Sequence, residues 1–300
     1  MSARDVALAV AATSAWGFSF VLIKLGLDDL PPLLFAAMRF LGVAIPWVLF
    51  VPFPDVGWRW TLFVGLVLGV GQFGMLFVAI DLGMPAGVAA VVLQAQVPLT
   101  VLAATVVLSE PMSLLAAAGV ATSTFGLALI GLDRGGAGLL PFILVIGAAA
   151  AWAASNIAIR VARPAQPVAL IVWSSMVAPV PLVGLSLIFD GPDAIGDALS
   201  SFSLGQLGVV LYVSLVATLG AFSAWALLLR RYSPQMVAPF GLLIPLVGLV
   251  STWAVLGEEP SVLELAGAFL VLCGLVGATL GMARQPRAPS LVLADTHSRE

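Results

Sequence analysis

The stretch AWGFSFVLIK at residues 15–24 is matched by AWAASNIAIR at residues 151–160, and this match decides the fold. It pairs Trp16 with Trp152 at an offset of 136 residues, and both stretches end on a cationic side chain. The chain therefore contains two copies of one unit. Further pairs follow at an offset of 148: Glu110 with Glu258, Gly119 with Gly267, and Gly126 with Gly274.

The composition places this duplicated chain in a lipid bilayer. Of its 300 residues 61% are hydrophobic and 9% are charged, against about 45–50% and 25% in soluble proteins. With 12 Lys+Arg and 15 Asp+Glu there is no basic surface for nucleic acid. The single cysteine, Cys273, excludes an internal disulfide, and the single histidine, His297, lies in a polar tail. We therefore expect no metal site and no cofactor.

Apolar runs of about 20 residues, each long enough to cross a bilayer, recur along the whole chain. Since each half has five spans, an odd number, the second copy must enter the membrane from the opposite side. The sequence predicts an all-α integral membrane protein with two inverted five-helix repeats, residues 1–135 and 136–283, followed by a disordered cytoplasmic tail, 284–300. Such repeats are typical of secondary transporters that bind substrate near the midplane. The ten spans are 5–25, 32–50, 58–80, 86–108, 113–132, 139–160, 166–189, 205–230, 234–256 and 262–282.

Lys and Arg predict the orientation, because cytoplasmic loops retain them. With the N-terminus inside, only Lys24 and Arg134 lie outside, and both termini are cytoplasmic. The inner side then carries Arg4, Arg59, Arg160, Arg163, Arg230, Arg231, Arg284, Arg287 and Arg299.

A family resemblance rests on several features together: Trp-Gly and a following Phe in the first span, an Arg in the second, a Pro about 12 residues before a Glu, and a glycine-rich fifth span. With ten spans and a repeat, these resemble the EamA branch of the drug/metabolite transporter superfamily, and within it the YddG-type aromatic amino-acid exporters. The resemblance covers nearly the whole chain. It implies a multi-pass protein of the plasma (bacterial inner) membrane that exports small metabolites.

Aromatic side chains are the first candidates for a substrate site. Trp16 and Phe20 share a helix face by their spacing of four, and Trp152 lies at the corresponding depth in the second half. Because both indoles lie mid-span, they fit the wall of a central cavity better than an interfacial belt. Phe73 and Phe240 complete the aromatic candidates.

Amides at membrane depth are the second group, because an unpaired amide in lipid is costly. Gln72 is predicted either to contact substrate or to clamp neighbouring helices, since it shares a face with Gly65 and Gly69. For Gln94 and Asn156 the sequence favours substrate contact.

Prolines inside the fourth and ninth spans remove N–H groups and so release backbone carbonyls. Pro98, Pro239 and Pro245 are therefore candidate hinges, and the released carbonyls could bind an ammonium group; ordinary kinks are the alternative.

Two cations could have a charge role. Arg39 lies about seven residues into its span, where it either binds substrate or satisfies carbonyls at a helix end. Lys24, like Arg160, lies near the end of its span, where its long side chain can reach the membrane–water interface and anchor the helix.

The function predicted from these features is a secondary exporter or facilitator of small metabolites, aromatic or large neutral amino acids, that works by alternating access through an aromatic-lined cavity. Alternatives are a sugar-phosphate or nucleotide-sugar exchanger, which needs several midplane cations, and a lipid scramblase or membrane scaffold. The sequence contains no nucleophile paired with a base that would suggest an enzyme. It also has no Asp or Glu in the middle of a span, so a carboxylate relay for proton coupling has no candidate residue. The expected partners are a small molecule and membrane lipid, with the oligomeric state open.

Overall fold

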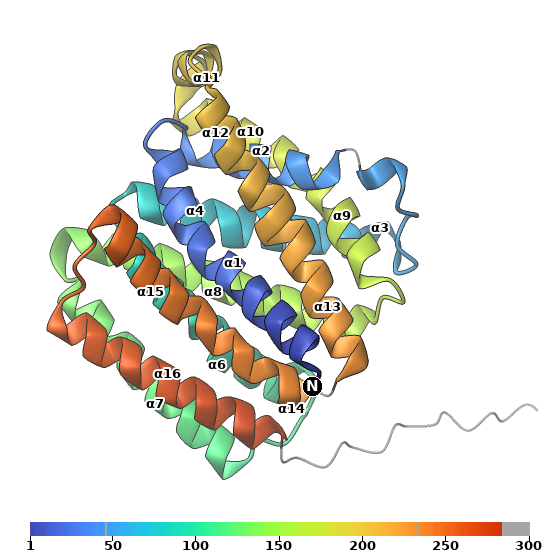
Figure 1. The fold of residues 1–300 in the computed structure, drawn as a ribbon, viewed down its shortest axis with the longest axis vertical. Coiled ribbons are helices and arrows are strands. Elements are labelled where there is room, and N and C mark those ends of the chain that lie inside the picture. The colour runs from blue at the N-terminus through green and yellow to red at the C-terminus, as the bar shows by residue number, and fades with distance from the viewer. Residues whose placement is uncertain (46, 233, 284–300) are drawn as a thin grey trace, which may run out of the picture.

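The computed structural model describes residues 1–45, 47–232 and 234–283, and these residues form helices with no strand (Figure 1). The predicted tail, 284–300, lies outside the described residues, as does His297. The elements are α1 (Ala3–Leu27), α2 (Pro32–Ala44), η1 (Trp47–Leu49), α3 (Gly57–Val64), η2 (Gly65–Gly74), α4 (Met75–Asp81), α5 (Ala86–Val92), η3 (Leu93–Ala95), α6 (Gln96–Val107), α7 (Leu114–Asp133), η4 (Gly136–Gly138), α8 (Leu139–Ala162), α9 (Pro167–Val177), α10 (Pro179–Phe189), α11 (Gly191–Ser200), α12 (Leu204–Leu211), η5 (Tyr212–Gly220), α13 (Ala221–Arg231), α14 (Pro234–Val237), η6 (Ala238–Leu242), α15 (Leu243–Leu256) and α16 (Val262–Ala283).

Ten helical units within the described residues are long and apolar enough to cross a membrane, which confirms the ten predicted spans. Several units combine consecutive elements; the third, for example, runs through α3, η2 and α4. The ten units are Ala3–Leu27, Pro32–Leu49, Gly57–Asp81, Ala86–Val107, Leu114–Asp133, Leu139–Ala162, Pro167–Phe189, Leu204–Arg231, Ala238–Leu256 and Val262–Gly281.

Several helix ends are set by local sequence. At the start of α7 the Ser113 hydroxyl accepts from the Ala116 N–H, and at α12 Ser203 and Gln206 cap each other's backbone reciprocally. Gly257 ends α15 at a φ of 68°, a left-handed conformation that glycine adopts without strain.

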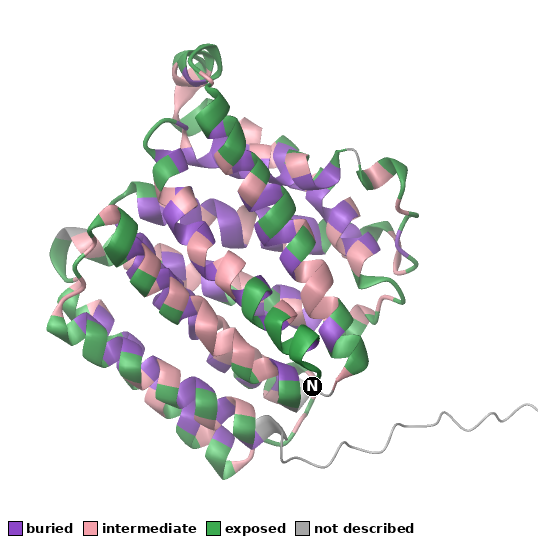
Figure 2. Cartoon of the chain, in the orientation of Figure 1, coloured by how far each residue is buried: buried purple, intermediate pink, exposed green. Residues whose placement is uncertain are grey.

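The packing of the helices has the exchange symmetry that inverted repeats require. The first span, α1, packs along α15 of the ninth, and the sixth span, α8, packs along α6 of the fourth. The fifth and tenth spans, α7 and α16, lie side by side along their length at one edge of the bundle (Figure 1). Buried residues gather where α1, α2, α4, α5 and α8 meet (Figure 2).

Glycine permits the close contact of α7 with α16. A Cβ at Gly126 would lie 2.6 Å from the Gly267 carbonyl oxygen, and one at Gly267 would lie 2.7 Å from the Gly126 carbonyl oxygen. The two backbones therefore touch directly, as small residues allow in membranes.

Both halves carry the same departures from α-helical geometry. The third and eighth spans each contain a π-helix, η2 and η5, and the fourth and ninth each contain a 3-10 turn, η3 and η6. A π-helix shifts the backbone hydrogen bonds by one residue and often occurs at functional sites.

Between the seventh and eighth predicted spans, residues 191–200 form a short helix, α11, which projects from the bundle (Figure 1). Pro192 in its first turn fits a helix start, and Ala198 is buried.

Candidate functional site

A cavity lies at the centre of the bundle, and its walls come from spans of both halves. The cavity has a volume of about 50 Å³, enough for a few waters. The lining residues are Trp16, Ser19, Phe20, Ile23, Arg39, Gln72, Phe73, Leu76, Trp152, Phe222 and Ile244.

Trp16 joins the two halves at this cavity. Its indole Nε1 donates to the Ala217 carbonyl oxygen at 2.6 Å, within the π-helix η5. Its ring meets Phe222 edge-on, with centroids 5.0 Å apart, and Trp225 at 5.6 Å. This hydrogen bond satisfies the indole N–H and fixes the ring as part of the aromatic wall.

Arg39 lies between the two π-helices and is 2% exposed. Its Nη2 donates to Thr218 Oγ1 of η5 at 2.8 Å, and its Cζ lies 3.8 Å from the centroid of Phe73 of η2. Its backbone carbonyl accepts from Ser214 Oγ at 2.9 Å. A hydroxyl and an aromatic face thus hold the guanidinium; the second is a cation–π contact.

Two polar atoms in the cavity walls have no hydrogen-bond partner among the described residues: Arg39 Nε and Gln72 Oε1. Gln72 is 2% exposed and sits in η2 beside Phe73. An unsatisfied buried donor or acceptor is destabilising and calls for an explanation.

The structure brings together six of the residues singled out from the sequence and separates three from them. Trp16, Phe20, Gln72, Phe73, Trp152 and Arg39 all line the cavity. Gln94, Asn156 and Phe240 do not belong to its lining.

Each of these three has a different environment. Gln94 is buried in η3. The Asn156 amide nitrogen donates to Gln96 Oε1 at 3.0 Å and to Thr100 Oγ1 at 3.4 Å, which ties α8 to α6. Phe240 packs in a separate apolar cluster with Ala9, Leu228 and Val237.

The proline candidates lie next to the two 3-10 turns. Pro98 follows η3 within α6, Pro239 lies in η6, and Pro245 follows η6 within α15. The Gly241 carbonyl, which Pro245 cannot satisfy, accepts instead from the Leu243 N–H. The tighter turn therefore compensates for the missing donor, and a hinge role for these prolines stays a prediction.

The cations that end the repeated stretches lie away from the cavity. Lys24 Nζ pairs with Asp28 at 2.7 Å, and Arg160 Nη2 pairs with Glu110 at 2.5 Å. Both pairs are solvent-exposed, so they add little to stability.

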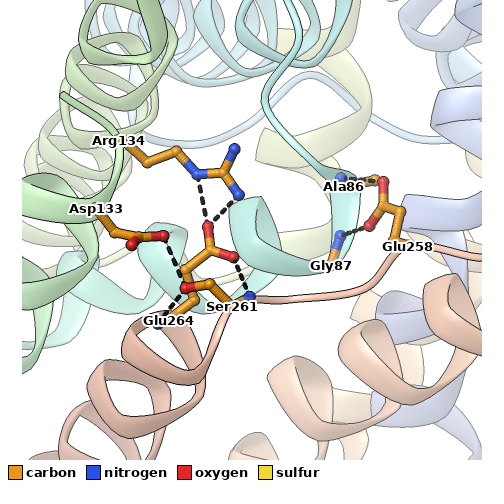
Figure 3. A network of polar contacts seen from close by, with 7 residues as sticks. All are labelled: Ala86, Gly87, Asp133, Arg134, Glu258, Ser261 and Glu264. Carbon is orange, nitrogen blue, oxygen red and sulfur yellow. Dashed lines mark hydrogen bonds and ion pairs between the residues drawn. The ribbon is translucent and has the colours of Figure 1, made fainter. Parts of the chain in front are cut away.

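A polar network links the end of α7 to the start of α16 (Figure 3). Arg134, at the end of α7, forms an ion pair with the buried Glu264 of α16. The Ser261 hydroxyl donates to Asp133 at 2.7 Å, and the Ser261 N–H donates to Glu264 at 2.9 Å. The sequence placed Arg134 at the outer side together with Lys24 and did not reveal this partner.

In the same region the Glu258 carboxylate covers the N-terminus of α5 (Figure 3). It accepts from the N–H groups of Ala86 at 2.7 Å and Gly87 at 2.9 Å. This contact joins the end of α15 to the start of α5, where a helix favours negative charge.

Sequence reasoning missed five lining residues: Ser19, Ile23, Leu76, Phe222 and Ile244. Ser19 and Ile23 follow the Trp16 to Phe20 face at helical spacing, which could have identified them. Phe222 and Ile244 had no comparable signal. In the described residues no group of His, Cys, Asp or Glu is placed to hold a metal ion.

Comparison with known proteins gives concordant results. The model of the EamA-like transporter family matches residues 4–132 and again residues 139–280. A probable amino-acid metabolite efflux pump of Salmonella typhimurium is 39% identical over 92% of this chain and 94% of its own length. A protein of the same description from Escherichia coli is 36% identical over 94% and 97%. A protein crystal structure shares the fold with a TM-score of 0.60 and 21% identity, covering 95% of this chain and all of the other.

Proposed function

The chain belongs to the EamA-like transporter family, and we propose that it exports amino acids, aromatic or large neutral ones, across the bacterial inner membrane. The observation that carries the proposal is the central cavity, whose walls include Trp16, Phe73, Trp152 and Phe222. Aromatic walls favour aromatic and large apolar side chains by stacking and by burial of apolar area. Two relatives described as amino-acid metabolite efflux pumps support the choice of substrate class.

The proposed mechanism is alternating access between the repeats 1–135 and 136–283. The cavity lies between elements of both, so a rocking motion of one repeat against the other would open it to each side in turn. The small volume of the cavity fits a contracted stage of such a cycle. We propose no enzymatic activity, since the family and the relatives are transporters.

The exchanger of phosphorylated sugars has weaker support. A phosphate dianion needs several cationic or N–H donors, and the cavity lining contains one cation, Arg39. A lipid scramblase or a scaffold would give no exchange of amino acids between vesicle lumen and medium. Counterflow of amino acids into proteoliposomes containing the purified protein therefore tests the proposal against each alternative.

Trp152→Ala should weaken transport of phenylalanine without reducing the amount of folded protein. Loss of a stacking partner removes about 0.5–1.5 kcal/mol beyond burial, so we expect the KM for counterflow to rise about two- to tenfold. The matched control is Trp253→Ala, because Trp253 is exposed on α15 and lies outside the cavity. Unchanged transport with a lower melting temperature would instead make Trp152 a packing residue.

Both termini should lie in the cytoplasm, because nine of the 12 Lys+Arg residues fall on that side in the ten-span arrangement. In a Cys273→Ala background, we expect a membrane-impermeant maleimide to label the Asp193→Cys variant on intact cells. The Ser298→Cys variant should react only after permeabilisation. The reverse pattern would place the termini outside.

A further inference from the structure

The central cavity holds a cation that lacks an acidic partner. The ion pairs in the described residues join Lys24, Arg134, Arg160 and Arg231 to carboxylates, and Arg39 is in none of them. Among ionisable side chains, Arg39 alone lines the cavity. A guanidinium shielded from water and without a counter-ion is costly in a membrane and by default suggests a functional site.

The described contacts of Arg39 do not use all of its hydrogen-bond donors. Nη2 donates to Thr218, Phe73 lies against the face of the group, and Nε has no acceptor among the described residues. Arginine binds carboxylates through pairs of parallel N–H groups that include Nε. The geometry thus holds the group in place and keeps a donor for an anionic oxygen.

Gln72 supplies the complementary acceptor. Its Oε1 is buried, has no donor among the described residues, and belongs to the same cavity lining as Arg39. A carbonyl oxygen without a donor is suited to an ammonium group. One unpaired donor on a cation and one unpaired acceptor therefore belong to residues that line the cavity, whose other walls are largely apolar and aromatic.

We propose that Arg39 binds the carboxylate of the transported molecule and that Gln72 Oε1 accepts a hydrogen bond from its ammonium group. The cavity then selects zwitterionic α-amino acids over amines, esters and carboxylic acids that carry one of the two groups. A single cation matches one carboxylate and does not neutralise a phosphate dianion. This inference rests on the proposed function and identifies the recognition chemistry of the same site.

The test is counterflow of labelled phenylalanine into proteoliposomes, with unlabelled competitors that each lack one group. For the wild type, phenylalanine methyl ester and 3-phenylpropionate should compete on the order of 10- to 100-fold less well than phenylalanine, since each loses one charge-assisted hydrogen bond. In Arg39→Gln the KM for phenylalanine should rise by a similar factor, and the ester should compete as well as the amino acid. In Gln72→Met, 3-phenylpropionate should compete as well as phenylalanine.

The matched control is Arg59→Gln, which removes an exposed arginine on α3 and should leave KM and competitor order unchanged. If Arg39 only stabilised the fold, its variant would lose folded protein but keep the discrimination against the ester, and that result overturns the inference. An ester that competes equally in the wild type overturns it too, while the proposed function stands. If the wild type exchanges none of the amino acids, the proposed function falls and this inference falls with it.

Discussion

Gly274→Leu should abolish stable folding of the bundle. A Cβ at Gly274 would lie 2.5 Å from the Gly119 carbonyl oxygen and would also overlap Ser123 of α7. These neighbours are largely backbone, so no side-chain rotation relieves the overlap and α7 must move away from α16. Overpacking costs about 1–3 kcal/mol in a well-packed core and more where the backbone is the obstacle. We therefore expect little monodisperse protein by fluorescence-detected size-exclusion chromatography.

Gly208→Leu is the matched control for this experiment. Gly208 is exposed on α12, and a Cβ there would meet nothing within 4 Å. Leucine is also a better helix former than glycine. The control should therefore retain the melting temperature and yield of the wild type, and a Gly274→Leu protein that does the same would show that α7 and α16 are not in backbone contact.

Arg134→Met should destabilise the protein by about 3 kcal/mol, the lower end of the range for breaking a buried ion pair. The Glu264 side chain is 3% exposed and that of Arg134 is 22% exposed. Without the guanidinium the Glu264 carboxylate keeps the Ser261 N–H but loses its counter-ion. The expected result is a lower thermal midpoint in detergent, measured by intrinsic tryptophan fluorescence.

Lys24→Met provides the comparison for the ion pair. Lys24 and Asp28 are 38% and 54% exposed, so breaking this pair should cost about 0–1 kcal/mol. The double variant Arg134→Met with Glu264→Gln should recover part of the loss, because no unpaired carboxylate remains buried. Equal effects of Arg134→Met and Lys24→Met would mean that Glu264 is hydrated.

The number and order of the membrane spans could be predicted because each requires a long apolar run, and charges or turn residues separate these runs. The short helix α11 could not be predicted in this way, because it is neither long nor apolar. It has ten residues and polar side chains, so it carries no membrane signal. Its proline in the first turn and Asp193 next to it were the available evidence for a helix start.

The cavity was predictable only in part, because a span that is apolar all round does not indicate which face points inward. Depth and polarity identified Trp16, Trp152 and Arg39. They did not separate Asn156 from the cavity, since the partners of its amide, Gln96 and Thr100, lie on another span. The two π-helices also rotate the residues that follow them, and no residue pattern in these uniformly apolar stretches specifies them.

The glycine contact between α7 and α16 provides a frame of reference for measuring motion. Sliding α7 along α16 would bring side chains against backbone that now meets glycine. This pair, one helix from each repeat, should therefore stay fixed while the other four spans of each repeat rock against each other. The only cysteine of the chain, Cys273, lies exposed on α16. A spin label on this native residue would sit on the stationary pair. Its distance to a second label on α10 or α13 would then record the displacement of that helix alone.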